Sequence, residues 1–362
     1  MSEFYIGLMS GTSIDGIDAV LVNLEGNKHE IIASHYEKMP DVLRHSILEI
    51  CTPGNNEINR MGELDYAIGK QFALAANILI EKSNVKRENI LAIGSHGQTI
   101  RHHPAKNFTL QIGDPNVIAA TTGITTIADF RRRDIAHGGQ GAPLVPAFHQ
   151  AIFLDKKSNR TILNIGGIAN VTLLPTIGNV LGFDTGPGNT LLDAWTEKHL
   201  QKKHDEKGAW ASRGNIHTQL LENLLNDPYF KLNPPKSTGR EYFNIAWLEK
   251  YLSSSITPID VQATLVELTA KSIFNAIHPF FETGEIFICG GGVHNDYLLL
   301  RLKTLANKHF IASTAKLGVD PDWVEAIAFA WLAKQTLEKK PGNLTAVTGA
   351  QKETILGGVY FA

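Results

Sequence analysis

Residues 4–22, which read FYIGLMSGTSIDGIDAVLV, carry the pattern on which the fold prediction rests. The apolar runs 4–9 and 19–22 have the composition of β-strands, and a turn-rich segment, 10–16, lies between them. We therefore predict a β-hairpin. The small residues of its turn allow backbone N–H groups to approach phosphate oxygens, and its hydroxyls add donors. The turn is a candidate phosphate-binding loop, and an ordinary hairpin turn is the alternative interpretation.

The same pattern returns in the middle of the chain. Two β-rich runs, 160–165 and 168–174, are separated by Gly166 and Gly167. A third related segment is the apolar run 285–289, which ends in a glycine triplet at 290–292. Two glycine hairpins followed by a strand that ends in glycines resemble the actin/hexokinase/heat-shock chaperone architecture. In that architecture a nucleotide lies in a cleft between two α/β domains.

The remaining periodicity supports the α/β class, because strands alternate with helices along the chain. Helices are expected around residues 64–75 and over 191–195, 258–281, 296–305 and 323–337, and further strands over 90–94, 109–112 and 125–128. We expect a crossing between domains at 129–146. The resemblance to the actin/hexokinase/heat-shock chaperone architecture implies two actin-like (ribonuclease H-like) domains with an ATP and substrate cleft between them. The first covers 1–135 with about 350–362, and the second covers 136–349. The polar stretch 201–240 is expected to form surface loops.

Composition excludes several function classes. The chain has 362 residues, enough for two domains, and its net charge of −2 offers no basic field for nucleic acid or anionic membranes. No apolar run approaches the ~18 residues of a membrane span, and the N-terminus lacks a signal-peptide pattern. Cys51 and Cys289 are far apart, as is typical of reduced thiols. We expect a cytoplasmic protein with no nucleic-acid or membrane partner.

Familiar nucleotide motifs are missing from the sequence. It contains no Gly-x-x-x-x-Gly-Lys-Ser/Thr, which argues against a P-loop kinase. No Gly-x-Gly-x-x-Gly follows a strand with an acidic residue suitably downstream, which argues against a Rossmann site. If the protein handles phosphates, the glycine hairpins are the device that remains.

Asp184 is the carboxylate predicted to carry chemistry. It precedes a Thr-Gly-Pro-Gly-Asn turn and is expected to be exposed at the end of a strand. There it can accept a proton from a nucleophile or help to hold Mg²⁺. The alternative interpretation is an aspartate that caps the next helix.

Four further side chains are candidates for substrate contact. His96 and Gln98 follow a predicted strand, and a structural histidine is the alternative for His96. Arg131 is a candidate anion clamp. Glu325 opens an apolar helix, either as a first-turn acid stabilised by the helix dipole or as a second active-site carboxylate. His102 and His103 have no third ligand nearby, so we predict no metal site on protein side chains alone.

These motifs together resemble the anhydro-N-acetylmuramic acid kinases of bacterial cell-wall recycling. The resemblance runs from the N-terminus through the glycine triplet, across nearly the whole chain. The segments that carry it are MSGTSIDGID at 9–18, SHGQTIR at 95–101, QIGDP at 111–115, DFR at 129–131, GGQGAPLVP at 138–146, NIGGIAN at 164–170 and GFDTGPGN at 182–189.

The resemblance implies a reaction and a set of roles. ATP would phosphorylate O6 of 1,6-anhydro-N-acetylmuramic acid while water opens the anhydro bridge, giving N-acetylmuramic acid 6-phosphate and ADP. Asp184 would activate the water. Mg²⁺ and a homodimer are implied as well, with Asp15, Asp18 and Asp184 as candidates for organising the ion. The implied nucleotide-binding residues are Gly11, Thr12, Ser13, Ile14, Asp15, Gly16, Ile17, Asp18, Asn164, Gly166, Gly167, Gly290, Gly291 and Gly292. The substrate-side residues are His96, Gln98, Arg131 and Glu325.

Three other functions are weighed against this one. An ordinary sugar kinase would use Asp184 as a base toward a free hydroxyl instead of water. A nucleotide-driven conformational module, like actin or the heat-shock chaperones, would need a polymerising or peptide-binding surface. A glycoside hydrolase without ATP would leave the glycine hairpins without a purpose.

Overall fold

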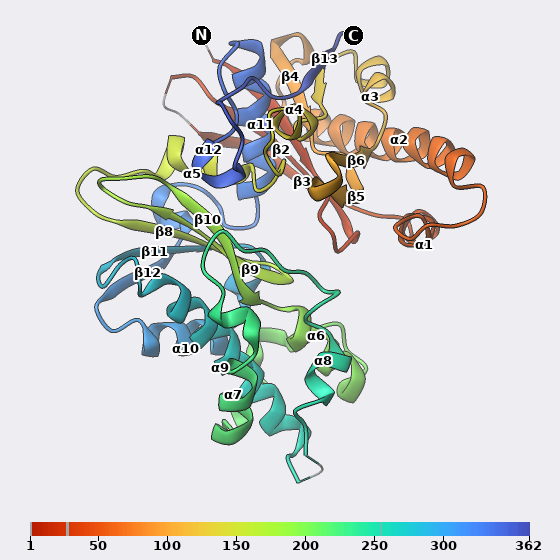
Figure 1. Cartoon of the computed structure of the whole chain (residues 1–362). Helices are drawn as coiled ribbons and strands as arrows, with labels where there is room; N and C mark the ends of the chain where they lie inside the picture. Colours follow the sequence, from red (N-terminus) through yellow and green to blue (C-terminus); the bar gives the residue numbers. More distant parts are fainter. Residues whose placement is uncertain (1, 27–28, 254) are drawn as a thin grey trace. The chain divides into compact units, whose positions relative to one another are not determined.

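The computed structural model describes residues 2–26, 29–253 and 255–362, and the chain divides into two compact units. Unit 1 consists of residues 1–152 and 323–362, and unit 2 consists of residues 153–322. Residues 136–152 and 323–349, which the sequence analysis assigns to the second domain, lie in unit 1. Figure 1 shows the chain coloured from its N-terminus to its C-terminus, and each unit is described separately below.

Unit 1 is built on a six-stranded mixed sheet with the order β13-β7-β4-β1-β2-β3. The predicted hairpin is confirmed, because β1 pairs with β2 antiparallel from Phe4 opposite Asn23 to Met9 opposite Asp18. β3 continues the antiparallel meander, whereas β4 and β7 run parallel to β1. The strands are β1 Phe4–Met9, β2 Gly16–Asn23, β3 Glu30–Lys38, β4 Ile90–Ser95, β7 Thr126–Ala128 and β13 Gly358–Tyr360.

Helix α11 (Val324–Leu337) explains why the C-terminal segment belongs to unit 1 (Figure 1). It lies directly against β1 and β4, which present glycines to it. A Cβ on Gly7 would be 1.8 Å from the carbonyl oxygen of Ala326, and one on Gly94 would be 2.0 Å from that of Phe329. No side chain fits at either position, so the two glycines allow the helix backbone to rest on the sheet.

The rest of unit 1 surrounds this sheet. Its other helices are α1 Asp41–Ile50, α2 Glu57–Ser83, α3 Pro115–Thr122, α4 Arg132–Ala136, α5 Val145–Phe153 and α12 Thr345–Thr348. The predicted helix around 64–75 is the middle of α2, which buries Leu64, Ile68, Phe72 and Leu79 against β1 and β2 in one core cluster. The expected strand at 109–112 is confirmed as β6 (Phe108–Ile112), although it pairs with β5 (Gln98–His103) in a separate small sheet.

Unit 2 has a five-stranded sheet with the order β10-β9-β8-β11-β12. The second predicted hairpin is confirmed, with Ile165 opposite Ala169 at its turn. β10 extends the antiparallel meander, and β11 and β12 run parallel to β8. The strands are β8 Arg160–Ile165, β9 Ile168–Leu174, β10 Leu181–Pro187, β11 Gly284–Cys289 and β12 His309–Ser313.

The strand order of unit 2 matches that of β3-β2-β1-β4-β7 in unit 1, with antiparallel and parallel pairs at the same places. Each unit is thus a hairpin meander continued by parallel strands, with helices connecting them. The predicted fold class, two actin-like α/β domains, is confirmed.

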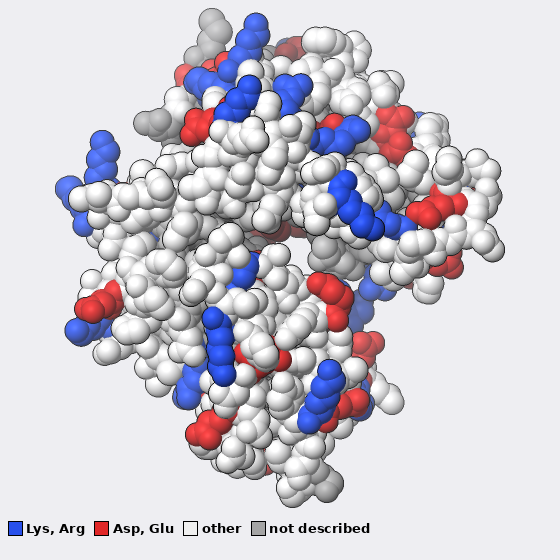
Figure 2. Space-filling model, in the orientation of Figure 1, with Lys and Arg blue, Asp and Glu red and all other residues white. Residues whose placement is uncertain are grey.

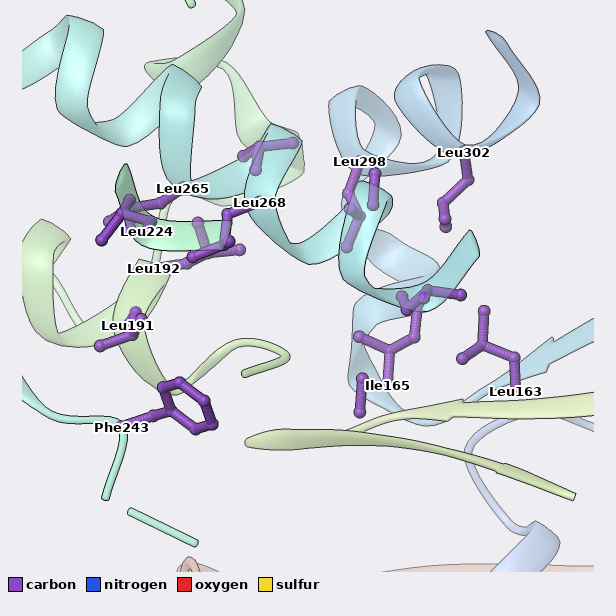
Figure 3. Packing of buried hydrophobic residues seen from close by; sticks show 14 of the residues in the cluster. Leu163, Ile165, Leu191, Leu192, Leu224, Phe243, Leu265, Leu268, Leu298 and Leu302 are labelled. Carbon is purple, nitrogen blue, oxygen red and sulfur yellow. The ribbon is translucent and has the colours of Figure 1, made fainter. Parts of the chain in front are cut away.

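The core of unit 2 lies between its sheet and its helices. The helices are α6 Thr190–Leu200, α7 Thr218–Leu225, α8 Ile245–Glu249, α9 Pro258–Ile277 and α10 Asp296–Leu305. The core cluster in Figure 3 includes Leu163 and Ile165 of β8, together with Leu265 and Leu268 of α9 and Leu298 and Leu302 of α10, and Phe243 lies near Leu191. The prediction that 201–240 forms surface loops is wrong in part. Helix α7 lies in this stretch and buries three leucines in the core, because they share one face of the helix.

Three further features concern the surface charge, the cysteines and the length of the helices. On the face drawn in Figure 2, Lys and Arg side chains are interspersed with Asp and Glu among the described residues. Cys51 is half-buried, and Cys289 is buried at the end of β11. Among the helices of the described part of the chain, none has the length and apolar character needed to cross a membrane.

Candidate functional site

In unit 2 the second glycine turn is held by the loop that follows β10. The N–H of Gly188 donates to the carbonyl of Gly167 at 2.9 Å, and the N–H of Asn189 donates to that of Gly166 at 2.8 Å. Thr190 adds a bond of 3.0 Å to Gly167. A Cβ on Gly188 would be 2.4 Å from the Gly166 carbonyl oxygen, so only glycine allows this approach. Two segments that sequence analysis singled out separately therefore form one structure.

The glycine triplet lies beside the same hairpin, because β11 pairs with β8 and places Cys289 opposite Asn164. Gly290 has a φ of 79°, and a Cβ there would be 2.2 Å from the Asn164 side-chain oxygen. Gly292 is packed against Ile165 in a similar way, whereas a Cβ on Gly291 would meet nothing within 4 Å. The triplet thus combines two tightly packed glycines with one exposed stretch of backbone that a ligand can approach.

Asp184 lies within β10, opposite Asn170 and beside a β-bulge, and it is largely buried rather than exposed as expected. Its carboxylate accepts a hydrogen bond from the N–H of Thr238 at 2.9 Å, and its N–H donates to the carbonyl of Lys236 at 3.1 Å. Tyr229 donates its hydroxyl hydrogen to the Asp184 carbonyl at 2.9 Å. The capping alternative is wrong, because the residue at the N-cap of α6 is Asn189.

The surroundings of Asp184 tune its charge. Burial raises the pKa of the carboxyl to about 6, and nearby Glu241 adds to the rise. The Thr238 N–H bond and the Lys236 ammonium act in the opposite direction by favouring the charged form. Burial in turn lowers the pKa of Lys236. A carboxylate with a pKa of about 6 is mostly ionised at pH 7 and still basic enough to accept a proton.

The residues that hold Asp184 were missed by sequence analysis. Lys236 lies over the ring of Tyr229, with its ammonium nitrogen 4.8 Å from the ring centroid. The segment is anchored by Asp227, whose buried carboxylate accepts bonds from the Tyr229 N–H, the Tyr242 hydroxyl and the Trp247 indole N–H, each at 2.8–2.9 Å. The only local signal was a Lys-Ser-Thr-Gly-Arg run after two prolines, which reads as a polar loop.

In unit 1 the first glycine turn is stabilised by hydrogen bonds from side chains. Ser10 donates its hydroxyl hydrogen to the Gln98 side-chain oxygen at 2.8 Å, and the same hydroxyl lies 2.9 Å from the Gly16 carbonyl. The Ser13 hydroxyl is bonded to the Asp15 carboxylate. Ile14, which has a φ of 55°, is buried and anchors the turn to the core of unit 1. Thr12 and Asp15 of the same turn are exposed.

The buried His96 and the half-buried Arg131 form a pair next to this turn. One ring nitrogen of His96 lies 3.1 Å from the Ser10 carbonyl, and the other lies 2.8 Å from the Arg131 guanidinium. Arg131 also donates to the Gly141 carbonyl at 2.9 Å, and its Nε has no partner among the described residues. Burial and the adjacent Arg131 lower the pKa of His96 to about 3, so the imidazole is neutral and one of its ring nitrogens accepts a hydrogen bond from the Arg131 guanidinium.

Glu325 lies in the first turn of α11, close enough to Arg131 for each charge to favour the other. Burial raises the pKa of its carboxyl, and Arg131 opposes the rise. Among the described residues, the carboxylate has no hydrogen-bond or ion-pair partner. A half-buried, unpartnered carboxylate beside a half-buried guanidinium is costly for the fold, which is typical of a ligand-binding position.

Comparison with known proteins places these features in a family. The family model described as anhydro-N-acetylmuramic acid kinase matches residues 3–362. The chain belongs to the anhydro-N-acetylmuramic acid kinase family. It is 54% identical over 366 residues to a protein of that name from Shewanella pealeana, covering 99% of both chains. A Coxiella burnetii protein of the same name is 54% identical over 365 residues, covering 99% of this chain and 98% of the relative.

Solved structures show more distant likeness. The activator of the 2-hydroxyisocaproyl-CoA dehydratase from Clostridium difficile with bound ADPNP is 14% identical, with a TM-score of 0.48, covering 92% of this chain and 97% of that one. A ROK family glucokinase from Streptomyces griseus in complex with glucose and AMPPNP is 11% identical, with a TM-score of 0.41, covering 92% and 99%.

The residues that the resemblance to the anhydro-N-acetylmuramic acid kinases singled out fall into two groups. In unit 2 the structure brings together Asn164, Gly166, Gly167 and the triplet 290–292 around the end of β8. In unit 1 it brings together the first glycine turn, His96, Gln98 and Arg131 through a chain of hydrogen bonds, with Glu325 near Arg131.

Proposed function

We propose that this chain is an ATP-dependent kinase that hydrolytically opens the anhydro ring of 1,6-anhydro-N-acetylmuramic acid and phosphorylates O6. The products are N-acetylmuramic acid 6-phosphate and ADP, in peptidoglycan recycling. The observation that carries this proposal is the position of Asp184, a carboxylate with a raised pKa that is held by backbone bonds next to a glycine turn. Membership of the family supplies the substrate.

Asp184 performs the hydrolytic part of the reaction as a general base. It removes a proton from water, whose oxygen forms a bond to the anomeric carbon while the bond from that carbon to O6 breaks. The released O6 forms a bond to the γ-phosphorus as the bond from that phosphorus to the ADP oxygen breaks. The Thr238 N–H keeps the carboxylate in position, and Lys236 favours its charged form.

The nucleotide is assigned to the glycine-rich segments. In unit 1, residues 11–18 would bind phosphate through backbone N–H groups and the exposed Thr12 hydroxyl. In unit 2 the nucleotide would be bound by main-chain groups of Asn164, Gly166, Gly167 and the glycine triplet. The open space above Gly291 supports this assignment, because a ligand can approach the chain there without displacing a side chain.

Mg²⁺ is the cation expected with the nucleotide. It usually binds one or two carboxylates together with phosphates and water, and the exposed Asp15 at the first turn fits this need. Asp18 and Asp184 are the other candidates. Among the described residues, no group of three or more His, Cys, Asp or Glu is arranged to hold a metal ion. When bound, the ion would neutralise charge on the phosphates.

On the substrate side, the proposal assigns His96, Gln98, Arg131 and Glu325. His96 and Gln98 are positioning residues, because their polar groups are bonded to Arg131 and to the first glycine turn. Glu325 and the unpaired Nε of Arg131 are the groups available for a ligand. A homodimer and a cytoplasmic location, where ATP is available, are proposed on the family resemblance alone.

The test is an ADP-release assay with Mg-ATP and 1,6-anhydro-N-acetylmuramic acid, run beside free N-acetylmuramic acid, with mass analysis of the products. We expect ADP only with the anhydro sugar, and a product heavier by one phosphoryl group and one water. Turnover of the free sugar instead would favour an ordinary sugar kinase, and turnover of neither would refute the substrate assignment.

A further inference from the structure

The segment that holds Asp184 continues to the second glycine turn. Thr238 donates its N–H to the Asp184 carboxylate, and two residues later Arg240 reaches the β8–β9 turn. A Cβ on Gly167 would be 3.3 Å from a terminal guanidinium nitrogen of Arg240 and 3.4 Å from its Nε. The guanidinium therefore lies against the backbone of the turn.

The backbone conformation does not explain why residue 167 is glycine. Gly167 is not among the residues with a positive φ, so other residues could adopt its main-chain geometry. What a side chain would meet first is the guanidinium of Arg240. The glycine thus leaves room for Arg240 to lie close to the turn to which we assign nucleotide binding.

The guanidinium of Arg240 is not neutralised by an ion pair among the described residues. Two other arginines of unit 2, Arg160 and Arg301, form close ion pairs with carboxylates at 2.7 Å. Arg240 is exposed, and among the described residues its side chain has no ion-pair partner and donates no hydrogen bond. Arg240 favours the charged form of Asp193 in α6 from a distance, without forming a hydrogen bond or an ion pair with it.

We propose that Arg240 is a further catalytic residue, whose guanidinium binds the phosphoryl group during its transfer at the β8–β9 turn. This inference rests on the proposed function and adds a residue to it. A guanidinium presents a planar fork of donors that matches phosphate oxygens, and charge on those oxygens must be stabilised as the phosphoryl group moves. Arg240 donates hydrogen bonds only and transfers no proton.

The position of Arg240 has a consequence for the two halves of the reaction. One short segment, 236–240, both holds the Asp184 carboxylate, which activates water, and carries the Arg240 guanidinium, which binds the phosphoryl group. A displacement of this segment would misplace both groups at once. Removing the Arg240 side chain alone would leave the Thr238 bond to Asp184 intact, so only the phosphoryl side should suffer.

The test uses the full chain with R240M, R240K and the control R213M, which removes another exposed arginine of unit 2. In the ADP-release assay we expect R240M to lower kcat by about 100-fold or more, by analogy with other arginines that stabilise phosphoryl transfer. R240K should recover part of the loss, and R213M should match the wild type. Activity of R240M within threefold of R213M would overturn the inference.

A binding measurement separates this inference from the choice of substrate. ADP with aluminium fluoride mimics the transferring phosphoryl group, and ADP alone lacks it. Calorimetry should show that R240M binds ADP with aluminium fluoride at least tenfold more weakly than R213M, while ADP alone binds equally. This readout holds even if the wild type does not turn over the anhydro sugar, an outcome that would refute the proposed function alone. Equal binding of the mimic by both variants would refute the role of Arg240.

Discussion

The raised pKa of Asp184 predicts that the variant D184N is inactive and also more stable than the wild type at neutral pH. Burial of the charged carboxylate raises its pKa from 3.8 to about 6, a shift of roughly 2 pH units. At 1.36 kcal/mol for each unit, ionised Asp184 costs the folded protein up to about 3 kcal/mol. An asparagine carries no charge, and its side-chain oxygen can still accept the Thr238 N–H.

The pH dependence gives this prediction its sign. Well below pH 3.8 the carboxyl is protonated in both folded and unfolded chains, so it does not affect stability. As the pH rises from there through the folded pKa of about 6, the unfolded chain loses its proton first and the wild type loses stability. The advantage of D184N should therefore be small near pH 4, grow as the pH rises through 6 and level off above about pH 7.

The assay is thermal unfolding of both proteins at pH 4.5 and pH 8, with turnover measured at pH 8. For a unit of this size, about 3 kcal/mol corresponds to a rise in Tm of roughly 6–12 °C, which is the upper limit for D184N at pH 8. Turnover should fall by about 100-fold or more, because the general base is gone. A variant that is less stable than the wild type at pH 8 would refute the reasoning about burial, and one that keeps substantial turnover would refute the role of Asp184.

Three other predictions concern the framework of the site. G7A should destabilise unit 1 by about 3 kcal/mol or more, because its Cβ would overlap the backbone of α11, whereas G62A, in an open position within α2, should be neutral or stabilising in thermal melts. R131M should lower the free energy of unfolding by about 2–4 kcal/mol, since it leaves two buried acceptors unpaired, and an effect no larger than that of the exposed R133M would contradict the network. D227N should reduce kcat by loosening the loop that holds the general base, while KM for ATP stays within about threefold; an unchanged kcat would show that the loop does not depend on this carboxylate.

Local sequence patterns were sufficient to predict the elements that carry the nucleotide-binding segments. The two glycine hairpins and the strand before the triplet were readable because each is a run of β-forming residues next to small turn residues. Their adjacency within unit 2 is visible only in the structure, where β8 pairs with β11.

The surroundings of Asp184 could not be predicted in the same way. Thr238 reaches Asp184 across 54 positions of sequence, and no periodicity records such a contact. The aromatic residues near Asp227 come from a stretch rich in polar residues and prolines, which reads as loop even though Tyr229 and Trp247 are buried. The exposure of Asp184 was misjudged for the same reason, since the segment that covers it is distant in sequence.

Local sequence patterns also could not predict which segments belong to unit 1 and which to unit 2. Helix α11 was predicted as a helix, but its place on the sheet of unit 1 depends on Gly7 and Gly94, which are more than 200 positions away from it. A glycine within a strand indicates a close approach without saying which segment approaches.

The seat of α11 on Gly7 and Gly94 has a consequence for how the protein is made. Unit 2 is one continuous stretch, whereas unit 1 needs a helix that is synthesised after unit 2 is complete. During translation, the first 152 residues leave the ribosome with the apolar face beneath α11 uncovered, and they wait for about half of the protein to follow. We therefore expect the middle of the chain to acquire its structure before the beginning does. Newly made chains that stop short of residue 337 should depend on chaperones to keep that face from aggregating.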